Sequence, residues 1–174
     1  MAVLVYIESE ENKFKKTAYE ALSYGKALAD KMGSKVSGLV INCSDTDSLK
    51  KYGADKIITI DNPDFQKFSS KKYSHAIAEV IKSENSSVVI LSSSANSKFI
   101  GAHLSGITDA AYVSNVVGIP ESISPFVIKR TCFTNKAFSS TEMIDGLKII
   151  SVSSNSFGMI ENFNDSAVES FNPE

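Results

Sequence analysis

The chain has 174 residues and a formal net charge of −2, and its 43% hydrophobic and 22% charged residues are close to globular averages. These values favour one folded domain and exclude whole-chain disorder, and the balanced charge gives no support to nucleic-acid binding. No apolar run approaches the roughly 18 residues that span a bilayer. The two cysteines, Cys43 and Cys132, form no CxxC pair, which predicts a reduced, cytoplasmic protein.

Strand-like and helix-like stretches alternate from the N-terminus onward. Apolar runs predict strands at residues 2–7, 35–41, 56–60, 87–91 and 112–117. Apolar residues spaced by three and four predict helices at residues 18–32 and 70–83, with shorter helices at 45–52 and 98–106, the last capped by Ser97. This alternation predicts an α/β fold with an open, mostly parallel sheet and helices on both faces.

The pattern changes after Pro120. Strand-like residues on both sides of Thr134 and Asn135 predict an antiparallel excursion near residues 126–141, and a last strand is predicted at 147–152. From Ser153 onward the chain is rich in Asn and Ser and has no periodicity, which predicts a linker or tail.

Motifs of common enzyme classes are absent from the sequence. There is no GxGxxG or P-loop, and the turn after the first strand, residues 8–12, is acidic and lacks glycine, which makes it a poor phosphate site. His75 and His103 have no metal-ligating neighbour at ligand spacing, and neither cysteine has a nearby histidine or basic cluster. We therefore predict no catalytic residue and no metal site.

One loop stands out because it follows the predicted strand 87–91 directly. Its candidate residues are Ser92, Ser93, Ser94, Ser97 and Lys98. Ligands of open α/β sheets bind beyond the carboxyl ends of strands, so these hydroxyls and the lysine are placed to hold a phosphate or ribose. The simpler alternative, which the residues alone favour, is an ordinary serine-rich loop in which Ser97 caps a helix.

A second candidate is the segment 129–138, which mixes cations and aromatic residues on strand-like backbone. Its candidate contact residues are Arg130, Phe133, Asn135, Lys136 and Phe138. Such a segment suits an arm that contacts another domain or subunit. A surface hairpin with polar residues facing outward is an equally good interpretation of these residues alone.

Four parts of the chain, taken together and in order, resemble one family. They are Val3–Glu8, Tyr52–Ile57, the pair Val88–Ser94 and Gly101–Leu104, and Lys129–Ala137. They are similar to the N-terminal domain of the alpha (large) subunit of electron transfer flavoproteins, including its GADKV and RPxYxGNA motifs. Thr131 stands where proline is usual in the second motif, and Thr134 where a small residue is usual. The resemblance extends from Val3 to about Gly158.

The resemblance implies the fold of adenine-nucleotide-binding α-hydrolase-like proteins. Proteins of this family are heterodimers that hold one FAD, mainly in a C-terminal domain of the alpha subunit. They carry electrons from dehydrogenases toward the respiratory chain through a membrane-associated quinone reductase. The corresponding domain of the beta subunit binds AMP, whereas the loop equivalent to residues 92–98 in the alpha subunit generally keeps no nucleotide.

For this chain, the resemblance implies an N-terminal α/β domain at residues 1–158 and a linker or tail at 159–174 that leads to a missing FAD-binding domain. We expect a fragment that is a scaffold and not an enzyme, that holds no FAD alone, and that packs against the beta subunit through the Arg130–Phe138 arm. An exposed apolar patch is expected to let the isolated fragment self-associate. The alternative is an autonomous adenine-nucleotide-binding protein that resembles universal stress proteins and uses the serine loop, although this chain lacks their Gly-rich phosphate loop.

Overall fold

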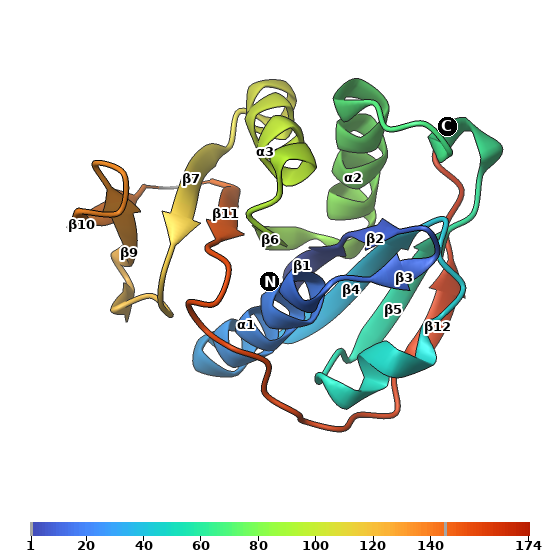
Figure 1. The fold of residues 1–174 in the computed structure, drawn as a ribbon, viewed down its shortest axis with the longest axis horizontal. Coiled ribbons are helices and arrows are strands. Elements are labelled where there is room, and N and C mark those ends of the chain that lie inside the picture. Colours follow the sequence, from blue (N-terminus) through green and yellow to red (C-terminus); the bar gives the residue numbers. More distant parts are fainter. Residues whose placement is uncertain (1, 145) are drawn as a thin grey trace.

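The computed structural model describes residues 2–144 and 146–174, and its main feature is a ten-stranded sheet (Figure 1). The spatial order is β10-β9-β7-β11-β6-β1-β4-β5-β12, with β8 beside β9. The parallel part consists of β1 (Ala2–Ile7), β4 (Lys35–Ile41), β5 (Lys56–Ile60), β6 (Ser86–Leu91), β7 (Ala111–Val116), β11 (Lys148–Val152) and β12 (Ala167–Ser170). The antiparallel part consists of β8 (Ser122–Ile123), β9 (Phe126–Cys132) and β10 (Ala137–Met143). The predicted α/β fold and its antiparallel excursion are both confirmed.

Helices cover both faces of the sheet, as the alternation of elements predicted. Helix α1 (Lys16–Met32) packs on one face, while α2 (Ser70–Glu84) and α3 (Ala95–Thr108) lie side by side on the other (Figure 1). The shorter elements are the hairpin of β2 (Ser9–Glu10) and β3 (Lys13–Phe14) and two 3₁₀ helices, η1 (Asp47–Lys51) and η2 (Pro63–Phe65). The short helix predicted at residues 45–52 is therefore a 3₁₀ turn. Among the described residues, no helix is both long and apolar enough to cross a membrane.

Strand β1 shows why the central strands are apolar on both sides. Its side chains alternate between the two faces of the sheet. Val3, Val5 and Ile7 belong to the core beneath α1, whereas Leu4 and Tyr6 belong to the core beneath α2 and α3. Because both faces are covered, neither set of positions tolerates polar residues, which explains the unbroken apolar run in the sequence.

The helix ends follow the expected caps with one correction. Gly33 ends α1 in the left-handed conformation, at φ = 61°, as the sequence predicted. Our assignment of Ser97 as the N-cap of the third helix is wrong, because α3 begins at Ala95 and its cap is Ser94. The Oγ atom of Ser94 accepts a hydrogen bond from the backbone N–H of Ser97 at 2.9 Å. Ser97 therefore lies in the first turn, where its hydroxyl is available for other contacts.

The segment after β11 contains a strand that the sequence did not predict. It was predicted to be a linker or tail, yet it passes α1, reaches the far edge of the sheet and forms β12 there (Figure 1). Strand β12 pairs in parallel with β5, with Ala167 opposite Lys56. Its pairing depends on main-chain hydrogen bonds, and all four of its residues are exposed. Hydrophobic periodicity therefore carried no signal for this strand.

A buried carboxylate holds the start of this segment against α1. Glu20 is 2% exposed and accepts hydrogen bonds from the backbone N–H groups of Asn155, Phe157 and Gly158, at 2.9, 2.8 and 3.0 Å. Burial alone raises the pKa of Glu20, but these backbone donors have the larger combined effect and hold its pKa below the usual range. One turn later, Ser23 Oγ accepts a hydrogen bond from the backbone N–H of Ile160 at 3.0 Å.

The strand order reverses between β1 and β6. Strand β1 pairs in parallel with β4 on one side and with β6 on the other, so the chain builds the sheet outward in both directions from this pair. Ligands of open α/β sheets bind at such a switch point, beyond the carboxyl ends of the strands. The residues that directly follow the two strands are Glu8 and Ser92.

Candidate functional site

Glu8 carries its carboxylate into the interior at the switch point, where only 7% of the residue is exposed. The hydroxyl of Ser92 donates a hydrogen bond to its Oε2 atom at 3.1 Å, and the hydroxyl of Ser97 reaches the same atom at 3.3 Å. The Nδ2 atom of Asn96 lies 3.5 Å from Oε1. One side chain therefore connects the end of β1 with the loop after β6 and the first turn of α3.

The serine loop is thus closed by contacts within the chain. Ser92 and Ser97 are buried, and their hydroxyl oxygens lie 3.0 Å apart. Ser93 Oγ is 2.8 Å from Ser154 Oγ, which joins the loop to the segment after β11. Lys98 is exposed. The four predicted serines gather at the switch point, but two of their hydroxyls point to Glu8, and nucleotide binding by this loop stays a prediction.

Sequence reasoning missed the role of Glu8. It treated residues 8–12 as an acidic turn unsuited to phosphate, without placing Glu8 against the serine loop. The sequence did contain a signal for this contact, because the first and fourth strands of a doubly wound sheet are neighbours. A carboxylate directly after one strand and hydroxyls directly after the other are therefore brought to the same place.

The predicted arm is the β9–β10 hairpin, which projects from one end of the sheet (Figure 1). Phe133 is 81% exposed and Phe138 is 63% exposed. The Nζ atom of Lys129 lies 4.5 Å from the centre of the Phe138 ring, which is close enough for a cation–π contact. Asn135 and Lys136 are exposed at the turn. Four of the five predicted contact residues therefore lie on an accessible surface.

Arg130 is the exception. Its Nε atom is buried and has no hydrogen-bond partner among the described residues. Burial raises the pKa of the neighbouring Tyr112 hydroxyl, and the positive charge of Arg130 acts in the opposite direction. Arg130 thus lies against the body of the domain beside β7, whereas Phe133 and Phe138 of the hairpin face solvent.

The tip of the hairpin has an unusual backbone. Phe133, Thr134 and Asn135 have φ angles of 49°, 53° and 63°, so three successive residues with side chains occupy the left-handed region. For Phe133 and Thr134 this conformation costs roughly 1–2 kcal/mol each, whereas Asn adopts it more readily. The strain lies in the segment that resembles the family motif, at the position where a small residue is usual.

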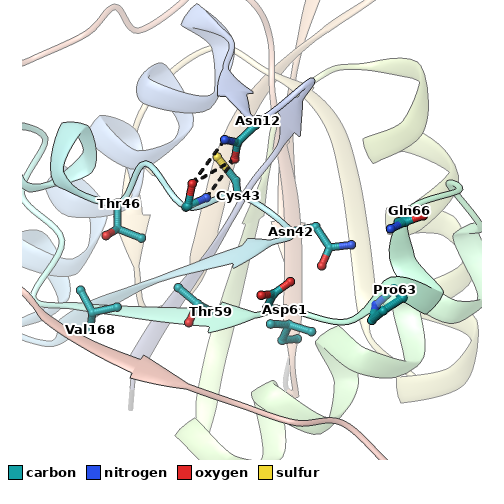
Figure 2. A pocket seen from close by; sticks show the side chains of 11 residues that line it. Asn12, Asn42, Cys43, Thr46, Thr59, Asp61, Pro63, Gln66 and Val168 are labelled. Carbon is teal, nitrogen blue, oxygen red and sulfur yellow. Dashed lines mark hydrogen bonds between the residues drawn. The ribbon is translucent and has the colours of Figure 1, made fainter.

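A separate cavity of about 620 Å³ lies at the carboxyl ends of β4 and β5 (Figure 2). Most of its amide groups already bind neighbouring loops. Asn12 Oδ1 accepts a hydrogen bond from the backbone N–H of Ser44 at 3.0 Å, and Asn42 exchanges hydrogen bonds of 2.9 and 2.8 Å with the backbone of Asn62. Burial raises the pKa of the Cys43 thiol, which keeps it protonated at neutral pH. Cys43 and Asp61 both line this cavity, but no hydrogen bond joins the thiol to the carboxylate among the described contacts.

The two histidines lie closer together than sequence spacing implied. The rings of His75 on α2 and His103 on α3 are 6.1 Å apart between centres. Across residues 2–144 and 146–174, no group of three or more His, Cys, Asp or Glu residues gathers in a way that suits a metal ion.

Comparison with known proteins gives a consistent result. The model of the electron transfer flavoprotein domain matches residues 3–174. The chain is 25% identical over 139 residues to the electron transfer flavoprotein subunit alpha of Bacillus subtilis (strain 168), covering 78% of this chain and 42% of that protein. It is 30% identical over 92 residues to the acryloyl-CoA reductase electron transfer subunit beta of Anaerotignum propionicum, covering 51% of this chain and 25% of that protein.

A third relative is subunit LctC of the lactate dehydrogenase (NAD(+),ferredoxin) of Acetobacterium woodii, which is 25% identical over 92 residues, or 51% of this chain and 22% of that protein. The chain thus spans less than half the length of these relatives. The family match extends over nearly the whole chain. The chain belongs to the electron transfer flavoprotein family.

Proposed function

We propose that this chain is the N-terminal scaffold domain of an electron transfer flavoprotein alpha subunit, and that it supports electron transfer without reacting itself. The main support is the combination of a family match over residues 3–174 with a switch point filled by the Glu8 side chain. Residues 1–158 form the core of this domain, and residues 159–174 lead toward a FAD-binding domain that belongs to the whole protein. In this proposal a dehydrogenase supplies its electrons, which the name of one relative, a lactate dehydrogenase subunit, supports.

The described residues do not fit FAD at the switch point. A flavin dinucleotide carries a diphosphate, and phosphates bind where backbone N–H groups and cations are free of competing negative charge. Here the Glu8 carboxylate already accepts the hydroxyl hydrogen bonds. In this proposal FAD is held by another domain of the whole protein.

The β9–β10 hairpin is the surface that we assign to the partner beta subunit. Large exposed aromatic side chains that flank a rigid turn are typical of interface anchors. Phe133 and Phe138 meet this description, and Lys129 adds a cation beside them. The same two side chains also give the isolated domain a means of self-association.

The partner assignment is tested by co-expressing the full-length alpha subunit with its beta subunit and separating the products by size. A chain carrying Phe133→Ser and Phe138→Ser is expected to lose at least tenfold in affinity for the beta subunit. The matched control is Phe99→Ser, because Phe99 is 65% exposed but lies on α3, away from the hairpin. Equal binding by the hairpin variant and the control would contradict the proposed interface.

The scaffold role is tested by titrating the purified 174-residue chain with FAD and recording visible absorption, and by calorimetry with AMP and ATP. Neither flavin nor nucleotide is expected to bind. Stoichiometric flavin binding would refute the scaffold proposal, and sub-micromolar AMP or ATP binding would favour the alternative of an autonomous nucleotide-binding protein.

A further inference from the structure

We infer that the carboxylate of Glu8 is a built-in anion that occupies the switch point in place of a ligand's phosphate or carboxylate group. This goes beyond the scaffold role, because it names the residue that decides what the site accepts. The inference is based on three observations at Glu8: its burial, the donors that surround it and the elements that those donors connect.

The Glu8 carboxylate is buried and hydrogen-bonded. Only 7% of Glu8 is exposed, and a buried carboxylate is destabilising unless it accepts several hydrogen bonds. Two hydroxyls, from Ser92 and Ser97, converge on Oε2, and the Asn96 amide lies at Oε1. The hydroxyl oxygens lie 3.0 Å apart, which is suited to sharing one anionic oxygen.

The surrounding charge supports the same conclusion. The hydrogen-bond donors described around Glu8 are all neutral. Two of them, Asn96 and Ser97, lie in the first turn of α3, a helix of 14 residues whose N-terminus favours negative charge. This turn and the two hydroxyls therefore stabilise one anion. A second anion nearby would be repelled by the Glu8 charge, and none of the ion pairs among the described residues involves Glu8.

The arrangement also connects three elements that are distant in sequence. Glu8 directly follows β1, while Ser92 and Ser97 are 84 and 89 positions further along the chain. In a protein that binds a nucleotide at its switch point, the ligand makes such connections only when bound. In this chain the bridging carboxylate is part of the protein, attached to the backbone after β1. It therefore connects the loop after β6 and the first turn of α3 to β1 without a ligand.

Chemical rescue tests the inference directly. In the variant Glu8→Ala the donors remain and the anion is gone, so an added small anion is expected to take its place. Thermal unfolding is followed for the 174-residue chain in sodium formate, acetate or phosphate, and in sodium chloride of equal ionic strength. We expect Glu8→Ala to melt about 5 °C or more below wild type and to recover at least about 2 °C in formate, acetate or phosphate relative to chloride.

The matched control is Glu10→Ala, two residues later in the short strand β2, where the carboxylate is exposed and pairs with Lys15 on the surface. Wild type and this control are expected to respond equally to all the sodium salts. If Glu8→Ala melts at the wild-type temperature, or recovers no better in formate, acetate and phosphate than in chloride, the inference is wrong.

A second variant keeps the test decisive if Glu8→Ala does not fold. Glu8→Ser removes the charge and shortens the side chain, which leaves room for an anion, and keeps a hydroxyl that can accept a hydrogen bond. The amide signal of Ser97 is followed by NMR while inorganic phosphate, AMP or adenosine is added. Saturable shifts with phosphate and AMP in Glu8→Ser, and none in wild type, are expected. Saturable binding of phosphate by wild type, a response to adenosine alone, or no response in the variant would each overturn the inference. The melting and anion-rescue measurements use neither the beta subunit nor FAD nor a nucleotide, so their outcome is separate from that of the scaffold proposal.

Discussion

The backbone N–H of Phe157 donates a 2.8 Å hydrogen bond to the carboxylate of Glu20, across 137 positions of the chain. The same carboxylate accepts the N–H groups of Asn155 and Gly158. One buried acid on α1 therefore fixes the direction in which the chain leaves β11 and passes toward β12.

Glu20→Gln is expected to lower the free energy of unfolding by about 1–3 kcal/mol, because an amide supplies only one acceptor oxygen to these buried N–H groups. Urea unfolding followed by circular dichroism measures the difference. The control is Glu161→Gln, since Glu161 is exposed in the same segment and its change is expected to leave stability within about 0.5 kcal/mol of wild type. An unchanged midpoint for Glu20→Gln would show that these hydrogen bonds contribute little.

Glu20 also predicts a pH dependence. Its pKa in the folded chain is below its usual range, so the folded state holds the proton less tightly than the unfolded state does. The resulting stabilisation is complete above the unfolded pKa of about 4.3 and is lost as the pH falls through the lower, folded pKa. Unfolding free energies measured from pH 7 downward should therefore show wild type and Glu20→Gln converging in acid. A difference that stays constant over this range would argue against the lowered pKa.

Two glycines of α3 provide a matched pair. A Cβ atom at Gly101 would lie 2.6 Å from Cζ of Tyr112, whereas one at Gly106 would meet nothing within 4 Å. Gly101→Ala is expected to destabilise the domain by about 1–3 kcal/mol, because the stiff Tyr112 ring must move. Gly106→Ala is expected to stabilise it by up to about 1 kcal/mol through helix propensity. Thermal or urea unfolding of both variants measures the effects, and a change of the same sign in both would be inconsistent with the packing of α3 on β7.

The hairpin tip predicts an unusual gain of stability from glycine. Thr134 has φ = 53°, and relief of this strain by Thr134→Gly gains about 1–2 kcal/mol. Glycine costs about 0.4–1 kcal/mol through the greater freedom of the unfolded chain, which leaves a small net gain. Thr141→Gly in strand β10 is the control and should be destabilising, since glycine weakens strand interiors. If Thr134→Gly lowers the urea midpoint as well, the tip is not strained.

Hydrogen exchange distinguishes a docked segment from a loose linker after β11. The backbone N–H groups of Asn162 and Phe171 donate to the carbonyls of Lys51 and Thr59, at 2.7 and 2.8 Å. Their amides are expected to exchange at least about tenfold more slowly than the same amides in the urea-unfolded chain. Exchange at the unfolded rate in the native protein would mean that this segment is free in solution.

Much of the fold could be predicted because its strands and helices bury apolar side chains in regular patterns. The run at Val3–Ile7 and the periodic helices gave the α/β class, and the glycine at position 33 marked the end of α1. Strand β12 could not be found in this way, since its residues are exposed and its partner, β5, precedes it by more than 100 positions. Polar contacts that depend on the completed fold leave little pattern in the local sequence.

In the candidate site, too, the local sequence predicted the position of the loop but not its contacts with distant residues. The serine loop was located correctly, because its position after an apolar run could be predicted from the sequence. The partner of its hydroxyls, Glu8, lies more than 80 positions earlier, and only the neighbouring arrangement of β1 and β6 brings them together. The N-cap of α3 was assigned three residues too late, because any of several successive serines is chemically suitable as a cap.

Strand β12 covers the edge of β5, and we expect this cover to protect the sheet against aggregation. Without it, β5 would present an open edge whose Ile57, Ile58 and Ile60 are buried in the folded domain, and open apolar edges pair readily with other chains. On β12 itself, Glu169 is charged and is held by Lys56 through a 2.7 Å ion pair. A version of this protein shortened to residue 158 should therefore be prone to form insoluble assemblies, whereas versions that keep residues 159–174 should stay dispersed at the same concentration.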